Sequence, residues 1–403
     1  MHEPDRQPPT VDPHRATDLA RLLADRLEET GDLRSPEWRR AVDTVPRHLF
    51  VPRYYEYGPD RWSLTDPVVD PGAYDRWLAA VYSDETLVTQ IDGAPLGDRD
   101  VMGRPAAYPT SSSTRPSLML RMLEALNLDA GTRVLEVGTG TGYNAALLAA
   151  RLGDANVTTV DVDQQVTDAA QKALDAAGYH PTVVTADGLT GHRAAAPYDR
   201  VIATCAVRSI PPAWIEQTRP GGQILATVGG GLSSYALARL TVTGNGRAEG
   251  GFLPDAASFM FARSQAVPAL WRHLRDLGTP ASEHDSELVS TVLDDPAFAL
   301  VAQFALGQVG RVDIRTEDGE RQVHLLTHDV RSWARITDAE GRTRVEQSGP
   351  RRLWDTVEEV HRAWSAQGRP APGQLVITAE SGHQTVFLPD SPLRWSLGGE
   401  TLS

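Results

Sequence analysis

The stretch Val134-Leu135-Glu136-Val137-Gly138-Thr139-Gly140-Thr141-Gly142-Tyr143 decides the fold that the sequence predicts. Its apolar start is typical of a short buried strand, and a helix is expected from Tyr143 to Arg151. Glycines between them allow positive φ and close approach of the backbone to a ligand. The pattern is G-x-G-x-G after an acidic residue, which differs from the G-x-G-x-x-G of dinucleotide sites, and the Gly-Lys-Ser/Thr of a Walker A loop is absent. A ligand loop at the carboxyl end of a strand is therefore expected.

Strands and helices alternate on both sides of this loop. Further elements are expected as strands at 157–162, 182–186, 198–204 and 223–228, and as helices at 116–128 and 164–177. Continuous apolar strands that alternate with helices predict an α/β fold with a parallel sheet covered on both faces.

Two aspartates follow the next two strands. Asp161 ends the strand after the loop, and a carboxylate there can accept hydrogen bonds from both hydroxyls of a ribose. Asp187-Gly188 follows the third strand, where a side chain can meet an adenine amine. The alternative is a structural glycine turn with two solvated aspartates. The order of loop, first acid and second acid favours a nucleoside cofactor at the carboxyl ends of parallel strands.

The remaining chain predicts a three-part division. Residues 1–85 comprise a disordered start at 1–13, helices from about 15–27 and 36–45, and an irregular segment at 52–75; residues 86–264 hold the cofactor; residues 265–403 form an α+β domain. In this last part helices are expected at 266–277, 285–306 and 351–366, and extended segments at 309–316, 320–328, 374–379 and 384–388.

Composition narrows the class of protein. The 403 residues carry a net charge of −14, which disfavours a nucleic-acid partner. A single cysteine, Cys205, excludes an intrachain disulfide and fits the cytoplasm. No apolar run is long enough to span a bilayer, so no membrane partner is expected. We expect a monomer.

Five segments together resemble the protein-L-isoaspartate O-methyltransferases, over about residues 17–262. They are Val45-Pro46-Arg47-His48-Leu49-Phe50-Val51-Pro52, Ala80-Val81-Tyr82-Ser83-Asp84, the glycine loop itself, Asp187-Gly188 with Ala196-Pro197-Tyr198-Asp199, and Ile210-Pro211-Pro212 with Gln217 and Pro220-Gly221-Gly222. The first of these is close to the family's N-terminal signature. It also has a purely structural interpretation, a packed helix end and turn with Phe50 in the core.

The resemblance implies a Rossmann-like domain, S-adenosylmethionine as cofactor and S-adenosylhomocysteine as product. It implies cofactor contacts at Glu136, Gly138, Thr139, Gly140, Gly142, Tyr143, Asp161, Val162, Asp187, Gly188 and Thr204, and substrate contacts at Ala206, Val207, Arg208 and Ile210. The family methylates the side-chain carboxylate of altered aspartyl residues in peptides.

The sequence departs from the family in two places. The family's Thr-Ile-Ser-x-Pro segment is here Ser112-Ser113-Thr114-Arg115-Pro116, so Thr114 replaces the serine close to the transferred methyl group, and residues 91–110 form a longer insert. The other departure is the domain at 265–403. Extended relatives of this kind resemble enzymes that methylate an aspartate of a cyclised ribosomal peptide, after which the ester closes to an aspartimide.

Thr114, with Ser112 and Ser113 beside it, is the candidate catalytic segment. A carboxylate acceptor is already ionised at neutral pH, so it needs orientation more than a base. The Thr114 hydroxyl could orient it, or could merely cap the helix that begins near Pro116. No zinc site is expected, because the histidines show no metal-ligand spacing with cysteines; Arg208 fits a surface arginine, and Trp354 and Trp364 fit a core.

Four hypotheses follow. The leading one is a carboxyl O-methyltransferase acting on Asp or isoAsp of a modified ribosomal peptide, with residues 265–403 helping to select it. The second is a general isoaspartyl repair enzyme. The third is a catalytically inactive scaffold that binds a precursor peptide, against which the intact loop and acids argue. The fourth is a small-molecule methyltransferase, which the N-terminal signature disfavours.

Overall fold

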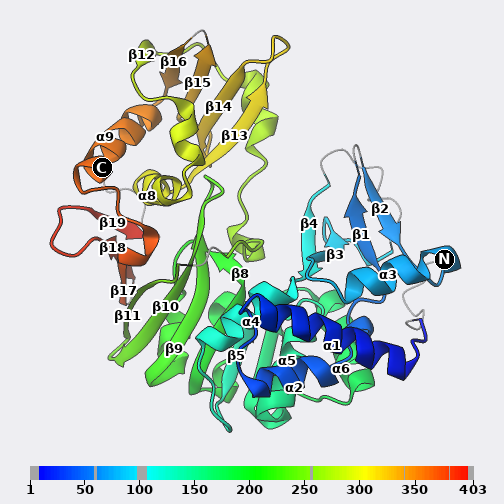
Figure 1. Cartoon of the computed structure of the whole chain (residues 1–403). Coiled ribbons are helices and arrows are strands. Elements are labelled where there is room, and N and C mark those ends of the chain that lie inside the picture. The colour runs from blue at the N-terminus through cyan, green and yellow to red at the C-terminus, as the bar shows by residue number, and fades with distance from the viewer. Residues whose placement is uncertain are drawn as a thin grey trace. The chain divides into compact units, whose positions relative to one another are not determined.

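The computed structural model describes residues 9–58, 61–97, 107–254, 257–339, 341–380 and 382–397 (Figure 1). The chain forms two compact units, Met1–Thr204 and Cys205–Ser403, and the boundary lies within strand β8 (Tyr198–Val207). The three-part division at residues 85 and 264 stays a prediction. Residues 1–8 of the expected disordered start lie outside the described residues, whereas Pro13 already begins a helix.

The first unit holds the expected parallel sheet. Its strands are β5 (Val134–Val137), β6 (Val157–Asp161), β7 (Thr182–Thr185) and β8, in the order β8-β5-β6-β7, and each neighbouring pair of these strands is parallel. Helices α5 (Tyr143–Leu152) and α6 (Gln164–Ala177) pack against β6. Because parallel strands end at one edge, the loops after β5, β6 and β7 gather there. This arrangement confirms the Rossmann-like α/β fold.

The N-terminal helices pack onto this sheet through α5. Helix α1 (Pro13–Glu29) contacts α2 (Pro36–Thr44), and α2 contacts α5. The guanidinium of Arg151 on α5 lies 4.3 Å from the ring centroid of the buried Trp38 on α2. A cation over an aromatic face adds to the burial of the indole, so it fastens α2 to α5.

Residues 52–75 were expected to be irregular, and that expectation is wrong. Strands β1 (Tyr54–Tyr57), β2 (Trp62–Thr65), β3 (Leu87–Ile91) and β4 (Pro109–Ser113) form an antiparallel sheet in the order β2-β1-β3-β4. Tyr and Trp fit a pleated, half-buried surface, so the aromatic residues of this segment lie in strands. Helices α3 (Tyr74–Val81) and α4 (Pro116–Ala125) follow β2 and β4. Residues 98–106 of the expected insert lie outside the described part.

The second unit contains two antiparallel sheets. After the short helix α7 (Pro212–Gln217), one sheet runs in the order β9-β10-β11-β17-β18-β19; its strands are β9 (Thr218–Gly229), β10 (Tyr235–Gly244), β11 (Arg247–Phe252), β17 (Val376–Glu380), β18 (His383–Phe387) and β19 (Arg394–Leu397). A Cβ on Gly250 would lie 1.9 Å from the main-chain oxygen of Arg239. Only glycine therefore allows β10 and β11 to approach so closely at this point.

The other sheet has the order β12-β16-β15-β14-β13. Its strands are β12 (Ser282–Ser286), β13 (Val309–Arg315), β14 (Arg321–Thr327), β15 (Trp333–Ala339) and β16 (Arg342–Ser348). Helix α9 (Leu353–Ala366) packs against β14, β15 and β16, and α8 (Pro296–Leu306) packs against α9 (Figure 1). Trp354 and Trp364 of α9 are buried, as expected for core residues.

Two helices expected in the second unit are corrected. The segment 266–277 forms a short 3-10 helix over Leu270–Asp276, and 285–306 divides into the end of β12, a 3-10 turn at Ser290–Asp294, and α8. Helix α8 begins at Pro296 because the Asp295 carboxylate accepts a hydrogen bond from the main-chain N–H of Ala297 at 2.9 Å. A proline after an aspartate is a helix start, and this signal outweighs the apolar periodicity upstream.

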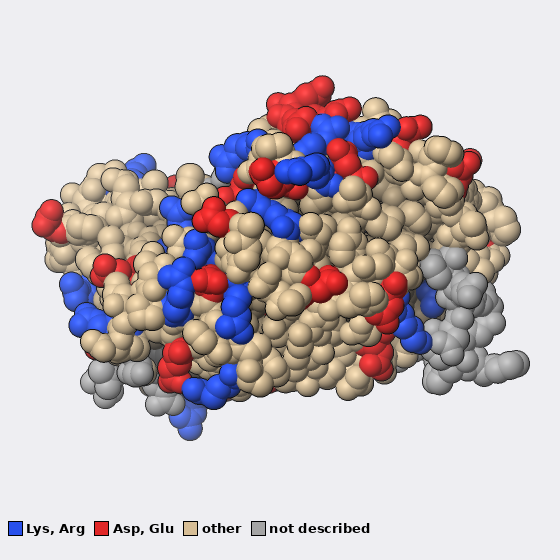
Figure 2. Space-filling model, turned by 90° about the horizontal axis from the view of Figure 1, so that it is seen from below, with Lys and Arg blue, Asp and Glu red and all other residues tan. Residues whose placement is uncertain are grey.

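Charged side chains are distributed without a single-sign patch on the face that Figure 2 shows, where acidic and basic groups alternate. Among the described residues, no helix combines the length and the apolar character that crossing a bilayer would need.

Candidate active site

The glycine loop between β5 and α5 has the backbone conformation that its sequence predicts. Gly138, Gly140 and Gly142 have φ angles of 99°, 52° and 87°. Gly142 is the N-cap of α5, and a Cβ there would lie 3.2 Å from the Cβ of Ala170 on α6. Side chains at these positions would strain the backbone or displace a neighbour. The loop thus brings bare main chain to the carboxyl end of the sheet.

Hydrogen bonds from neighbouring strands fix the loop. The main-chain N–H of Gly138 donates to the oxygen of Val160 at 2.8 Å, and the Thr204 hydroxyl on β8 donates to the oxygen of Gly138 at 2.6 Å. The hydroxyls of Thr139 and Thr159 lie 2.8 Å apart. Thr139 and Thr204 were both expected to contact the cofactor. In the structure their hydroxyls hydrogen-bond within the protein and stabilise the loop.

Glu136 is wholly buried beneath the loop. Its carboxylate accepts hydrogen bonds from the Asn144 amide at 2.6 Å and from the Thr159 hydroxyl at 2.6 Å. Burial raises the pKa of Glu136 to about 7, although these two donors act against the rise. The structure places this expected cofactor residue as an internal brace between β5, β6 and α5.

The two aspartates lie where the sequence predicts. Asp161 ends β6 partly exposed, and its carboxylate accepts from the main-chain N–H of Gly140 at 3.1 Å. Val162 beside it is 47% exposed, an unusual position for an apolar side chain. Asp187 is exposed after β7 and accepts from the N–H of Leu189 at 3.0 Å. A Cβ on the buried Gly188 would lie 2.4 Å from Val137 Cγ1, so this glycine serves packing against β5.

Strand β4 lies beside the glycine loop. A Cβ on Gly140 would be 3.4 Å from the main-chain oxygen of Ser112 and 4.0 Å from the hydroxyl of Ser111. Gln90 of β3 accepts from the Thr110 hydroxyl at 2.7 Å and donates to the carboxylate of Asp163 at 3.0 Å. Asp163 is the N-cap of α6 and lies two residues after Asp161, the last residue of β6. The structure therefore brings the Ser112–Thr114 segment to the expected cofactor residues.

Arg47 of the N-terminal signature holds the end of this segment. Its guanidinium is wholly buried and donates to the main-chain oxygens of Val81 at 2.7 Å, Ser83 at 2.8 Å and Glu85 at 3.2 Å. It also reaches the Ser113 hydroxyl at 3.4 Å and the oxygen of Thr114 at 3.3 Å. Burial lowers the pKa of Arg47. The signature thus ties residues 81–85 to the candidate catalytic segment.

The rest of the signature packs as a core. Phe50 is 3% exposed, and its ring centroid lies 5.7 Å from that of Tyr143 at the start of α5. His48 Nδ1 lies 2.8 Å from the Tyr82 hydroxyl, and burial lowers the pKa of His48 to about 4. Tyr143 is itself buried, which raises the pKa of its phenol to about 12. The structural interpretation of the signature is correct, and Arg47 adds a link to the site.

Thr114 does not cap helix α4. The N-cap is Arg115, which makes no side-chain capping bond, and the carboxylate of Asp84 accepts from the N–H of Ser117 at 2.7 Å instead. The capping role considered for Thr114 is therefore wrong, because a carboxylate from another part of the chain caps the helix. In the described part of the chain, no hydrogen bond of the Thr114 hydroxyl is found.

The residues expected to contact substrate lie in the second unit, and most are inaccessible. Ala206, Val207 and Ile210 are fully buried, and the main chain of Ile210 is held by the side-chain amide of Gln384. Arg208 is partly buried, which lowers the pKa of its guanidinium, and the expectation of a surface arginine stays a prediction. Its Nη2 donates to the oxygen of Ala266 at 3.3 Å, and its buried Nε has no hydrogen-bond partner within the part of the chain that the structure describes.

Sequence reasoning missed three residues of this site. Gln90, Arg47 and Asp84 come from segments that precede the glycine loop, and each acts on a distant partner. A glutamine in a strand carries no local signal. The signature containing Arg47 was visible, but its target was not.

The residues at the carboxyl end of the sheet fit a nucleoside cofactor. Three positive-φ glycines, of which Gly138 and Gly140 are partly exposed, a carboxylate at the end of β6 and another after β7 are the groups expected to contact it. The hydroxyl-bearing strand β4 lies beside Gly140. This arrangement can hold a nucleoside and present a second, polar reactant to it.

Comparison with known proteins identifies similar chains. A family model described as "Protein-L-isoaspartate(D-aspartate) O-methyltransferase (PCMT)" matches residues 101–250. A protein-L-isoaspartate O-methyltransferase from Methanosarcina mazei is 40% identical over 52% of this chain and 70% of its own length. The corresponding protein from Hyperthermus butylicus is 30% identical over 55% of this chain and 80% of its own length.

A solved structure titled protein-L-isoaspartate O-methyltransferase has a similar fold. It superposes with a TM-score of 0.53 at 21% identity and covers 92% of this chain and 99% of its own. The similarity of fold therefore reaches well beyond residues 101–250. An extended C-terminal part is thus not peculiar to this chain, and it carries no weight in choosing between acceptors.

Proposed function

The chain belongs to the protein-L-isoaspartate(D-aspartate) O-methyltransferase family and is an S-adenosylmethionine-dependent O-methyltransferase, and we propose that it methylates the side-chain carboxylate of an Asp or isoAsp in a constrained peptide. The observation that carries this proposal is the placement of β4 beside the glycine loop, with Thr114 at its end. The proposed acceptor is a cyclised ribosomal peptide, and the proposed state of the enzyme is a cytoplasmic monomer.

The bound cofactor supplies the methyl group, and the residues of the chain provide its position. Asp161 and Asp187 would accept hydrogen bonds from the ribose and the adenine amine, and Val162 would pack against the base. Gly138 and Gly140 would leave room for the ligand beside the main chain, whereas Gly142 allows the close packing of α6. Glu136 acts indirectly, by bracing β5 against β6 and α5.

The acceptor needs orientation rather than activation. An aspartyl carboxylate is ionised at neutral pH, with an ordinary pKa of about 3.9. The Thr114 hydroxyl is not engaged in capping, so it can donate to one carboxylate oxygen and direct the other toward the methyl group. Alignment of this kind, together with exclusion of water, is the larger part of catalysis for an in-line transfer.

The ester has a defined chemical fate. In the methyl ester, the next main-chain nitrogen attacks the carbonyl carbon, loses its proton and expels methanol, which leaves a succinimide ring. Water then opens the ring to Asp or isoAsp. Repair and peptide tailoring share the methylation step, so substrate preference distinguishes them.

The proposal of a constrained peptide rests on strand β4 and the residues on either side of it. Thr114 replaces the family's serine, the β3–β4 connection is long, and Tyr108 just before β4 is 68% exposed. An exposed aromatic ring beside the segment offers a contact that a short linear peptide does not require. The second candidate is repair of isoAsp in proteins generally, which the names of the similar proteins favour.

A mass-spectrometric comparison tests the proposal. The protein and S-adenosylmethionine are incubated with a linear isoAsp peptide or with a cyclised Asp peptide. Gain of one methyl group, or net loss of water after ring closure, on the cyclised peptide alone supports tailoring. Methylation confined to the linear peptide overturns it in favour of repair. The Gly138→Val protein, which should give no product on either peptide, is the control for enzyme-dependent transfer.

A further inference from the structure

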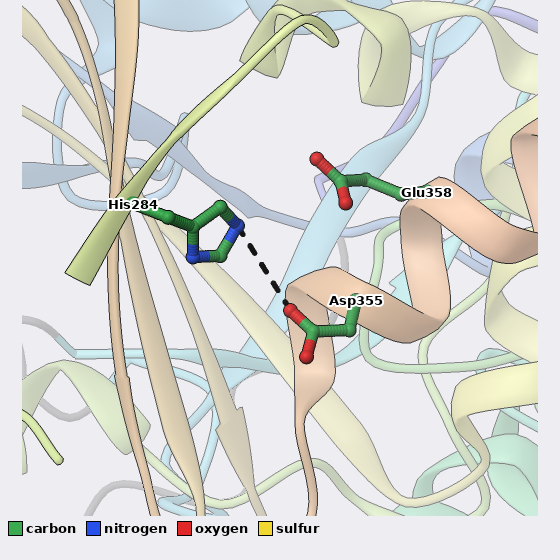
Figure 3. A group of neighbouring side chains, drawn as sticks. All are labelled: His284, Asp355 and Glu358. Atoms are coloured by element: carbon green, nitrogen blue, oxygen red, sulfur yellow. Dashed lines mark ion pairs between the residues drawn. The ribbon is translucent and has the colours of Figure 1, made fainter. Parts of the chain in front are cut away.

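A group of three potential metal ligands lies in the second unit and includes none of the residues assigned above. His284 belongs to β12, and Asp355 and Glu358 belong to the first two turns of α9 (Figure 3). One ligand atom of each residue lies within 4.8 Å of those of the other two. We propose that these three side chains bind a divalent transition-metal ion, with Zn²⁺ as the representative, which ties the edge strand β12 to helix α9.

The geometry of His284 and Asp355 favours an ion between them over a direct bond. His284 Nε2 lies 4.0 Å from an oxygen of Asp355, which is too long for a hydrogen bond. The exposed pair His180 and Asp175 shows the contrast, since its atoms approach to 3.1 Å. Zinc bonds of about 2.0–2.2 Å place two tetrahedral ligand atoms roughly 3.3 Å apart. A small side-chain rotation therefore suffices to close the group around an ion.

Asp355 and Glu358 are three residues apart on α9, and their carboxylates project from the same face of the helix. Residues three apart on a helix lie on the same face, so Asp355 and Glu358 point to the same side. Figure 3 shows both side chains leaving α9 toward the imidazole of His284. His284 comes from a strand that pairs with β16, opposite Val345. Two elements that meet at the edge of the sheet thus contribute the three ligands.

Neighbouring polar groups orient the carboxylates. The Ser286 hydroxyl donates to Glu358 Oε1 at 2.5 Å, and the Trp354 indole donates to Ser286 Oγ at 3.1 Å. The Gln347 amide donates to the carboxylate of Asp355. Such outer hydrogen bonds are a regular feature of metal sites, where they fix the rotamers of the ligands.

The local charge favours a cation. Within the described part of the chain, no arginine or lysine forms an ion pair with Asp355 or Glu358. Two carboxylates held close together repel each other unless a positive charge lies between them. One imidazole and two carboxylates match zinc and its first-row neighbours better than calcium, which takes six to eight oxygens. Partial exposure of His284 leaves a route for the ion and room for a water ligand.

The sequence could not show this group. Histidine and cysteine spacing reveals only local metal sites. His284 approaches Asp355 and Glu358 only through the pairing of β12 with β16 and the packing of α9 on that sheet. The prediction that the chain has no zinc site was based on the spacing of histidines and cysteines along the sequence. It did not consider ligands that come together only in the folded chain.

Zinc titration of the full-length protein tests the site. After treatment with a chelator and its removal, the protein is titrated with ZnCl₂ by calorimetry, and its thermal unfolding is followed with and without the ion. We expect one site per chain with a dissociation constant below 100 µM, on the order of 5 kcal/mol or more of binding free energy, and a rise in Tm of a few degrees from binding to the folded state alone. Absence of saturable binding at about 1 mM ZnCl₂, which corresponds to weak affinity, overturns the proposal.

Matched variants locate the ion, because other histidines of the chain can bind zinc weakly. His284→Gln and Glu358→Gln should each weaken binding at least tenfold and remove the rise in Tm. His180→Gln and Glu359→Gln should change neither, since His180 has one acidic partner and Glu359 lies outside the group. Equal affinity in His284→Gln and the unmodified protein assigns the zinc elsewhere and overturns the proposal. A cooperative unfolding transition at an unchanged Tm in the absence of zinc confirms that each variant is folded. Binding of S-adenosylhomocysteine, measured separately, keeps this test distinct from the proposed function.

Discussion

Arg47 donates from Nη2 to the main-chain oxygen of Thr114 across 3.3 Å, which joins two segments 67 residues apart. The same guanidinium binds the oxygens of Val81, Ser83 and Glu85, so one buried cation organises the approach to helix α4. Asp84, from the middle of that stretch, caps the helix. Thr114 therefore lies between a fixed strand and a separately capped helix.

Replacing Arg47 by lysine should lower methylation more than cofactor binding. An ammonium retains the charge but cannot span acceptors on both sides as the planar guanidinium does. Unpaired buried oxygens should cost about 3 kcal/mol of unfolding free energy. We expect kcat to fall at least tenfold, with the Kd for S-adenosylhomocysteine changed less than threefold. Arg40→Lys, on the exposed face of α2, is the control and should leave the rate unchanged. A rate of Arg47→Lys equal to that of the unmodified protein would exclude the positioning role of Arg47.

Thr114→Ala should slow methyl transfer without destabilising the helix. The hydroxyl makes no capping bond, so its loss should change the unfolding free energy by less than about 0.5 kcal/mol. Loss of a hydrogen bond to a carboxylate should lower kcat by roughly tenfold or more. Single-turnover rates with a saturating peptide measure the effect, and Thr114→Ser should restore most of the rate. An unchanged rate in Thr114→Ala would falsify the orienting role.

Gly138→Val should abolish cofactor binding. The φ of 99° is strained for any branched side chain, and the new methyl groups would occupy the ligand's side of the loop. Gly178→Ala is the matched control: it also has positive φ, but its Cβ would meet nothing within 4 Å. That control should lose about 1 kcal/mol of stability and keep its affinity for S-adenosylhomocysteine. Equilibrium dialysis compares the two, and retained affinity in Gly138→Val would remove the loop assignment.

Acid should destabilise the second unit through His324. Burial lowers the pKa of this imidazole to about 4, and among the described residues neither ring nitrogen has a hydrogen-bond partner. Its folded pKa lies below the unfolded value near 6.5, so stability is full above pH 6.5 and declines as pH falls toward 4. The decline from this group should be on the order of 3 kcal/mol. Urea unfolding between pH 7 and pH 4 measures how the free energy of unfolding depends on pH. This dependence should be weaker in His324→Leu than in the unmodified protein. The control variant His180→Leu, at an exposed histidine, should keep the original dependence.

The local parts of this fold could be predicted from sequence. Helix α6 runs from Gln164 to Ala177 as expected, because Asp163 caps its start and Gly178 takes a φ of 80° at its end. The glycine loop and the acids after β6 and β7 follow from the same kind of short-range signal.

The parts that depend on distant partners could not be predicted. The sheet of β1 to β4 pairs strands that are separated in sequence by a helix. The segment 52–75 alone therefore gave no sign of the strand pairing and was predicted to be irregular. Ala206, Val207 and Ile210 were expected at the substrate, yet their burial depends on contacts that no motif reveals. Arg47 and Gln90 act across the fold for the same reason.

The bridge made by Gln90 has a consequence for the order of events in turnover. Because Gln90 joins Thr110 on β4 to Asp163, two residues after the proposed ribose ligand Asp161, occupancy of one proposed ligand site should stiffen the other. We therefore expect a sequential mechanism in which the nucleoside enters before the peptide and leaves after it. Product inhibition by S-adenosylhomocysteine should then be competitive toward S-adenosylmethionine and noncompetitive toward the peptide, and cutting the bridge with Gln90→Leu should relax that order toward random entry.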